Sequence, residues 1–285
     1  FFAVLLGSDN GGTVTPTDGS VTSDKLAYPF VVNEDGAAAS DFRVESDSNT
    51  HMLFVDAGNN KIGINTSSPD DALHVKGNLF LEDSSPEITL ETTNSSHYNW
   101  QIAAQENVAN SFEIAVGSAD ADASNDSFTS TLLINSIGAV TMPLQPAFHV
   151  HPASDQTNFN QGQTVAIVFG TERFDLNGDF ASNTFTAPVT GKYRFDVSIR
   201  IKAMSTEDSA TYYYWSLVTS NRSYYNLASV NELGSGSGSF TFSGSVLADM
   251  DASDTASVTI IMGGTSGSSP SDISADSYFS GNLVC

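Results

Sequence analysis

Cysteine, basic residues and long apolar runs are scarce in this chain of 285 residues. The single cysteine, Cys285, is the last residue, so no disulfide can form within the chain. The fold must therefore be held by burial of apolar side chains and, we expect, by association of several chains. The apolar run at residues 1–6 is far too short to cross a bilayer, so no membrane insertion is predicted.

Positive charge is rare as well. The chain has 10 basic residues against 33 acidic ones, which gives a formal net charge of −23. A field of this sign repels the phosphates of nucleic acids and the surfaces of anionic membranes. Neither is predicted as a partner.

Recognisable catalytic motifs are also missing. The sequence contains no G-x-S-x-G, no H-E-x-x-H, no glycine-rich phosphate loop and no thiol next to a histidine. Carboxylates are so plentiful that counting alone leaves a glycosidase pair open. We expect a protein that is not an enzyme and requires no cofactor.

What the sequence does contain is strict alternation at residues 193–202. The apolar members Tyr193, Phe195, Val197, Ile199 and Ile201 alternate with Arg194, Asp196, Ser198, Arg200 and Lys202. A period of two is typical of a half-buried strand. Pro188 and Gly191 predict a corner before this strand, and residues 175–179 (DLNGD) predict another turn. The stretch indicates an antiparallel all-β domain.

The same residues carry a family resemblance. The pattern F-D…F…F-T-A-P-V-x-G-x-Y-x-F, which starts at Phe174, resembles the signature of the globular head shared by complement component 1q and the tumour necrosis factor superfamily. Residues 146–148 and 278–284 are similar to the opening and closing strands of that family. The resemblance covers about half of the chain and implies a ten-strand jelly roll that assembles as a tight trimer. The trimer interface or core would hold Phe174, Phe185, Tyr193, Phe195 and Phe279.

A second resemblance lies at residues 56–81, DAGNNKIGINTSSPDDALHVKGNLFL. The run is similar to the pattern G-N-V-G-I-G-T-x-x-P-x-x-x-L-x-V-x-G of bacteriophage tail fibres and spikes, from which Lys61 and Asn65 depart. Its strands of four to six residues are too short to bury a core within one chain. Three chains wound round one axis would supply the missing partners.

These signals predict an all-β homotrimeric fibre with four parts. Residues 1–40 form an N-terminal virion-attachment segment or linker, residues 41–80 an intertwined β shaft, residues 81–143 a small β knob, and residues 144–285 the jelly-roll head. Because about sixty residues make a marginal core, we expect the knob to need support from neighbouring subunits.

Aromatic residues gather at residues 212–215 (YYYW) and at the pair Tyr224-Tyr225. Aromatic faces stack on sugar rings and supply rigid contact area. Alternate members of a strand must be structural, so only one half of the cluster could contact a receptor. The candidate receptor-binding residues are Tyr212, Tyr214, Tyr224, Tyr225 and Arg222.

Two patterns could bind a metal. His149 and His151 lie two apart and would share one face of a strand, so that a trimer could bring six imidazoles to its axis for a transition metal. Asp120, Asp122 and Asp126 alternate as in a calcium loop, but the glycine and distant glutamate of an EF-hand are missing. The competing interpretations are solvent-exposed histidines and a solvated acidic loop.

Four of the 10 basic residues, Lys192, Arg194, Arg200 and Lys202, lie within one strand. We expect them to pair with nearby carboxylates, and a patch for an anionic sugar is the alternative.

Taken together, the patterns predict a trimeric bacteriophage tail fibre on the virion surface. Its partners would be further copies of itself, a virion protein at the N-terminal segment, and host-surface carbohydrate or protein at the head. A capsid-attached head fibre or decoration protein is the close alternative, and a glycan depolymerase or a bacterial secreted adhesin is an alternative of another class.

Overall fold

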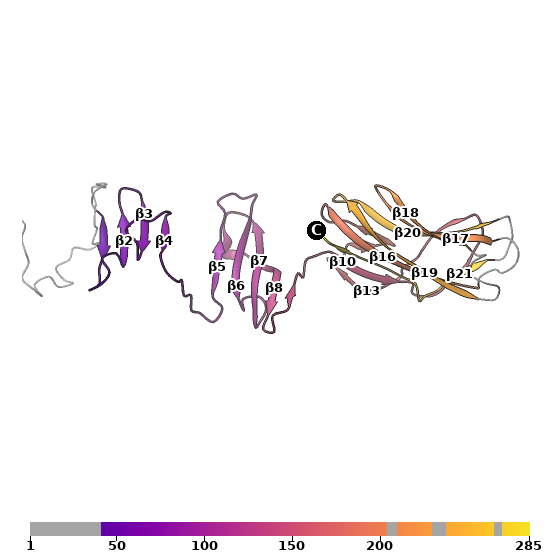
Figure 1. Cartoon of the computed structure of the whole chain (residues 1–285), viewed down its shortest axis with the longest axis horizontal. Coiled ribbons are helices and arrows are strands. Elements are labelled where there is room, and N and C mark those ends of the chain that lie inside the picture. The colour runs from indigo at the N-terminus through magenta and orange to yellow at the C-terminus, as the bar shows by residue number, and fades with distance from the viewer. Residues whose placement is uncertain (1–40, 204–209, 230–237, 265–269) are drawn as a thin grey trace, which may run out of the picture. The chain divides into compact units, whose positions relative to one another are not determined.

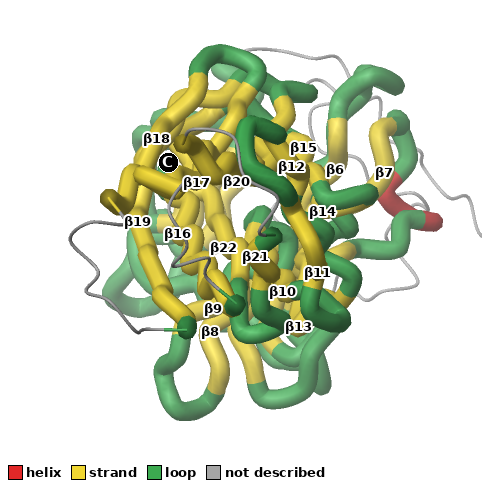
Figure 2. The backbone as a smooth tube through the Cα atoms, turned by 90° about the vertical axis from the view of Figure 1, so that its right-hand side faces the viewer, coloured by secondary structure: helices red, strands yellow, loops and turns green. Residues whose placement is uncertain are grey.

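The computed structural model describes residues 41–203, 210–229, 238–264 and 270–285. These residues are almost entirely strands, and their only helix is the short 3-10 helix η2 (Ala123–Asn125), red in Figure 2. No helix in these ranges is long and apolar enough to cross a membrane. The chain divides into two compact units, Phe1–Leu81 and Glu82–Cys285 (Figure 1). The predicted attachment segment, residues 1–40, lies outside the described residues.

The described part of the first unit is a single four-stranded sheet. Its strands, in sheet order, are β1 (Phe42–Val44), β2 (Leu53–Asp56), β3 (Lys61–Ile64) and β4 (Leu73–Val75). The β3–β4 pair is parallel and the others are antiparallel. Phe54 is the only large apolar side chain buried here, whereas Met52 and Leu73 are 46% and 61% exposed. These residues therefore have no hydrophobic core of their own.

The second unit begins with a five-stranded antiparallel sheet. Its strands, again in sheet order, are β5 (Glu87–Leu90), β6 (Tyr98–Ala104), β7 (Ser111–Ala119), β8 (Thr129–Asn135) and β9 (Val140–Thr141). One face of this sheet is covered by the chain's own loops and is lined by polar or small side chains such as Asn99, Glu113 and Ser130. The other face is apolar and open.

The described residues between 147 and 283 form a sandwich of two sheets, which we call the head. The first head sheet has the order β13 (Thr171–Leu176), β10 (Ala147–His151), β22 (Tyr278–Leu283), β16 (Gly191–Lys202) and β19 (Ser239–Met250), with β21 (Ser271–Ile273) and β11 (Gln156–Phe159) beyond one end of β16. The second head sheet has the order β14 (Phe180–Ala181), β15 (Thr184–Thr186), β20 (Thr255–Gly264), β17 (Ala210–Thr219) and β18 (Ser223–Ser229), with β12 (Thr164–Ala166) also paired to β20.

The chain passes back and forth between these two sheets, from β13 to β14, β15 to β16, β16 to β17, β18 to β19 and onward. This path is that of a double-sheet jelly roll, in which each sheet shields one face of the other. The predicted all-β class and the jelly roll are confirmed by this strand order, although the two sheets hold 13 described strands (seven and six) rather than the ten expected.

Side chains from both head sheets meet in one core. The alternation predicted for residues 193–202 is observed, because Tyr193, Phe195, Ile199 and Ile201 are all fully buried. The Phe148 ring lies between the sheets, 4.9 Å from the ring of Phe185 on the second sheet and 4.9 Å from that of Phe279 on its own.

Of the five residues predicted for the core or trimer interface, four lie in the core of the single chain: Phe185, Tyr193, Phe195 and Phe279. Phe174 is different. It is 49% exposed on the outer face of the first head sheet, where it pairs with His149. Phe174 is thus available to contact a partner, whereas the other four are buried among their own chain's side chains.

Candidate functional site: an aromatic patch on the second head sheet

The candidate site is built on strand β17, whose side chains alternate between core and surface. Tyr213 and Trp215 are each 1% exposed and point into the head. The Tyr213 hydroxyl lies 2.8 Å from that of Ser271, and burial raises the pKa of this tyrosine. Because successive strand residues point to opposite faces, Tyr212 and Tyr214 lie on the outside of the second head sheet.

The outward tyrosines of β17 meet a third on β18. The rings of Tyr212 and Tyr214 are stacked, with centroids 6.0 Å apart and an interplanar angle of 7°. Tyr225 meets Tyr214 edge to face at 5.6 Å. Tyr225 is 68% exposed, and Leu227, the cross-strand partner of Tyr214, is 62% exposed. We call Tyr212, Tyr214, Tyr225 and Leu227 the aromatic patch.

A glycine on the neighbouring strand sets the position of the patch. Gly263 on β20 is paired with Tyr212, and a Cβ atom at this glycine would overlap the tyrosine ring. The absence of a side chain at Gly263 therefore leaves room for the outer end of the Tyr212 ring over the backbone of β20. This contact helps to set the orientation of the stacked rings of Tyr212 and Tyr214.

Replacing Gly263 by alanine should move the Tyr212 ring and disturb its stacking on Tyr214. Because the displaced ring is at the surface, we expect a loss of unfolding free energy of only about 1–2 kcal/mol. The change in the patch should appear in the near-ultraviolet circular dichroism of tyrosine, and Gly238→Ala is the matched control because nothing lies near its missing Cβ. An unaltered tyrosine signal would contradict the proposed contact.

Two of the predicted receptor-binding residues do not belong to the patch. Tyr224 is on the opposite face of β18 from Tyr225, where it is paired with Leu217 and packs against the core. Arg222 is in the turn between β17 and β18, and its Nη2 donates to Asp249 Oδ2 at 2.8 Å. Tyr224 and Tyr225 point to opposite faces because they are successive residues of strand β18. The sequence would have separated them only if residues 223–229 had been predicted as a strand.

The predicted histidine pair lies on the first head sheet. His149 and His151 flank the buried Val150 and share the outer face of β10, beside a cleft of about 340 Å³ that is also lined by Arg173 and Tyr278. The His149 ring is stacked on Tyr278 at 5.3 Å. Burial first, and then the nearby Arg173, lower the pKa of His149. A neutral imidazole is the form that binds metals.

The predicted calcium loop is occupied by its own hydrogen bonds. The Asn99 amide donates to Asp120 Oδ1 at 3.1 Å and to Asp126 Oδ2 at 3.0 Å, and Asp122 accepts from the backbone N–H of Ser124 at 3.0 Å. In the described ranges, no three His, Cys, Asp or Glu side chains converge in a way that could hold a metal. A metal at either place stays a prediction from the sequence.

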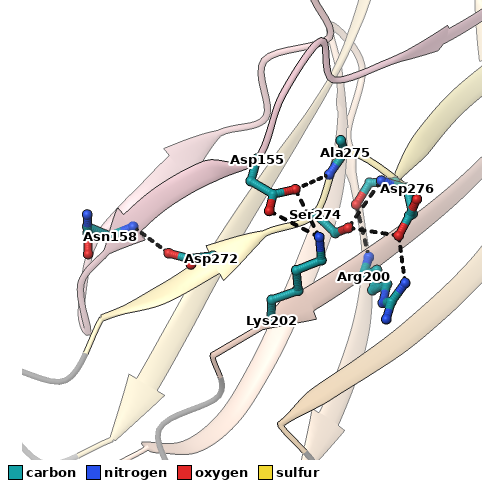
Figure 3. A network of polar contacts seen from close by, with 9 residues as sticks. Asp155, Asn158, Arg200, Lys202, Asp272, Ser274, Ala275 and Asp276 are labelled. Atoms are coloured by element: carbon teal, nitrogen blue, oxygen red, sulfur yellow. Dashed lines mark hydrogen bonds and ion pairs between the residues drawn. The ribbon is translucent and has the colours of Figure 1, made fainter.

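The basic residues of β16 largely pair within the chain, as expected. Arg194 binds Asp196 at 3.1 Å and Arg200 binds Asp276 at 2.6 Å. Lys202 donates to Asp155, whose carboxylate also accepts the N–H of Ala275 at 2.8 Å (Figure 3). This network ties the segment before β11 to the segment after β21 and leaves little free positive charge for an anionic sugar.

The chain was compared with known protein families, sequences and structures. No protein-family model and no curated protein sequence matches the chain. Among solved structures, the globular domain of zebrafish complement 1qA protein is similar at 20% identity and a TM-score of 0.35, over 50% of this chain and 98% of that one. Murine APRIL is similar at 8% identity and a TM-score of 0.36, over 49% of this chain and 99% of that one. These scores carry no argument about function, and the jelly roll is assigned from its own strand order.

Proposed function

We propose that this chain is a structural fibre protein of a bacteriophage virion, and that its head binds a carbohydrate or protein of the host surface. The observation that carries the proposal is the aromatic patch. Exposed tyrosines held in fixed orientation by a β-sheet lose little conformational entropy on binding, and many sugar rings have an apolar C–H face that can stack on them.

The proposed fibre is a homotrimer. The sheet of residues 41–81 leaves most of its apolar side chains exposed, which is unfavourable for a single chain in water. Packing against the same sheet of other copies would cover these side chains. Three heads on one trimer would also present three patches, so that weak individual contacts gain strength by avidity.

The attachment of the fibre belongs to the same proposal. Residues 1–40 would dock onto another virion protein, and residues 56–81 carry the resemblance to phage fibres. A tail fibre is our first choice, and a capsid-attached head fibre is the alternative. Immunogold labelling of intact particles decides between them, because label on the capsid surface rather than the tail would exclude the tail fibre.

The binding role can be tested with the purified full chain on an array of bacterial surface polysaccharides and on whole host cells. We expect Tyr214→Ala and Tyr225→Ala each to weaken binding by about 5- to 150-fold, taking as the scale the roughly 1–3 kcal/mol that a nucleic-acid base gains by stacking on one aromatic side chain. Val189→Ala, an exposed apolar residue elsewhere on the head, is the control and should bind as the wild type does.

Two outcomes would overturn the proposed binding role. Equal binding by the wild type and both tyrosine variants would place the contact elsewhere. Shortening of a polysaccharide during incubation would instead identify a depolymerase, and the protein would then be an enzyme.

A further inference from the structure

The sheet formed by β5 to β9 has its apolar side facing outward. Along β6, Asn99, Gln101 and Ala103 are buried, whereas Tyr98 and Trp100 are 58% and 41% exposed. Strand β7 repeats the pattern, with Glu113 fully buried and Phe112 44% exposed. This is the reverse of an ordinary one-sided sheet, in which the apolar face is covered and the polar face meets water.

Strand pairing brings the outward residues into one continuous surface. Ile88 is paired with Ile102 and Leu90 with Trp100, while Ile102 is also paired with Ile114. The surface continues across the remaining strands. We call it the open apolar face, and its members are Ile88, Leu90, Tyr98, Trp100, Ile102, Ala104, Phe112, Ile114, Val116, Leu132, Ile134 and Val140.

The loops that join these strands do not cover this surface, because they already pack on the opposite face of the sheet. The N–H groups of Asn107 and Val108 donate to Glu113 Oε1 at 3.1 and 2.9 Å, so the loop that joins β6 to β7 is fastened across the covered face. The acidic loop is fastened there too, through the hydrogen bonds from Asn99 to Asp120 and Asp126. The open apolar face must be covered from outside the sheet.

The area of the surface fits a protein interface. Its most exposed side chains are between 41% and 58% exposed, namely Ile88, Leu90, Tyr98, Trp100, Phe112 and Val140. For residues of this size the exposed part amounts to on the order of 600 Å², which approaches the roughly 800 Å² that each partner contributes to a standard interface. A monomer rarely exposes a contiguous apolar patch larger than a few hundred Å².

The charge of the molecule directs any contact between two copies to this uncharged face. The chain has a formal net charge of −23, so most approaches between two copies bring carboxylates together. The open apolar face carries no ionisable group except the phenol of Tyr98, so two copies can meet through it without that repulsion. Copies of one chain are also always present at equal concentration, and each brings the same uncovered area.

We propose that the open apolar face of β5 to β9 is an interface between copies of this chain, in which the sheets turn these faces toward one another around a common axis. The inference rests on the proposed function for the number of copies, which is three. The interface would make the sheet dependent on assembly for its stability. It also implies that the polar side, with its loops, forms the outer surface of the assembled fibre at this level.

Tryptophan fluorescence of the full-length wild type tests whether the face is covered. The chain has two tryptophans, and Trp215 is buried in the head at 1% exposure. Any emission quenched by acrylamide therefore reports Trp100. We expect both tryptophans to be protected at micromolar concentration. Quenching of about half of the emission under those conditions would mean that the face is open and would overturn the proposal.

A pyrene label tests whether the cover is another copy. Phe112 is on β7, the middle strand of the sheet, so labels at this position lie at the same level and approach each other when the sheets of three copies pack around one axis. We expect Phe112→Cys, in a Cys285→Ser background, to show pyrene excimer emission that disappears when labelled protein is assembled with a large excess of unlabelled protein. Tyr225→Cys in the same background is the matched control and should show none.

The outcomes separate this inference from the proposed function. Protected Trp100 without an excimer would mean that a segment of the same chain or another protein covers the face, and the inference would fail. Excimer emission with a mass of two chains by light scattering would support the interface and overturn the trimer. Excimer emission with unaltered cell binding after Tyr225→Ala would support the interface and overturn the binding role.

Discussion

Phe148→Ala should lower the unfolding free energy of the head by about 3–5 kcal/mol, the usual cost of deleting a buried phenylalanine ring. The ring is 1% exposed and touches four others, those of Phe180, Phe185, Phe195 and Phe279. Its removal leaves a cavity between the two head sheets that neighbouring rings cannot fill without leaving their own contacts. Denaturant unfolding of a chain that also carries Trp100→Phe, in which all tryptophan emission comes from Trp215, measures the effect.

Phe174→Ala is the matched control, because it deletes the same ring from the strand paired with β10 at a position that is 49% exposed. Its effect on the folding of one chain should stay below about 1 kcal/mol. If Phe174 contacts a partner in the assembly, its loss will grow with protein concentration, whereas the loss from Phe148 will not. Equal, concentration-independent losses at both positions would contradict the core described here.

Glu113→Ala should destabilise the sheet of β5 to β9 by about 3 kcal/mol or more. The carboxylate is fully buried and accepts from the hydroxyl of Ser130 at 2.6 Å and from the backbone N–H groups of Asn107 and Val108 at 3.1 and 2.9 Å. Its removal leaves these donors without an acceptor, and each buried unsatisfied group costs about 1–3 kcal/mol. Unfolding followed by Trp100 emission is the measurement, and Glu106→Ala, an exposed glutamate of the same loop, is the control.

The same carboxylate predicts a pH dependence. Burial by itself raises the pKa of Glu113, but the hydrogen bonds from Ser130, Val108, Asn107 and Ser111 outweigh it, and the pKa is lowered. The folded sheet therefore holds this proton less tightly than the unfolded chain. Its contribution to stability is fully present above the ordinary glutamate pKa of about 4.3 and is lost as the pH falls through the lower value of the folded state. A Glu113→Gln sheet should lack this acid-sensitive part, and an unchanged acid profile would contradict the assignment.

Much of the fold could be predicted because the local alternation of apolar residues agrees with the side chains that the folded sheets bury. In a two-sheet sandwich, the apolar residues that alternate along residues 193–202 must face the other sheet. The structure shows these residues buried. The DLNGD turn forms where Asn177 and Gly178 both adopt φ of 72°, and it carries the chain from β13 on the first head sheet to β14 on the second. Strand β18 was missed because its residues, SYYNLAS, alternate weakly and no strong turn signal precedes them.

The candidate site was predicted only in part for a related reason. Tyr212, Tyr214 and Tyr225 meet because of the register between β17 and β18, and Tyr224 points the other way by the same register. No sequence pattern predicts that Gly263, some fifty positions after Tyr212, makes room for the tyrosine ring. Such contacts join segments that are far apart in the chain, so no local pattern encodes them.

What the sequence by itself determined is that this protein is built from strands, has no disulfide within the chain, is strongly acidic and contains sheets too small to bury their own apolar side chains. Those properties follow from residue type and spacing. Only the tertiary structure decided which face of each strand is covered, because alternation defines two faces without saying which one meets the chain's own loops. In the sheet of β5 to β9 the loops cover the polar face, since Glu113 and Asn99 bind their backbone and side-chain groups there, and the apolar face is left for a partner.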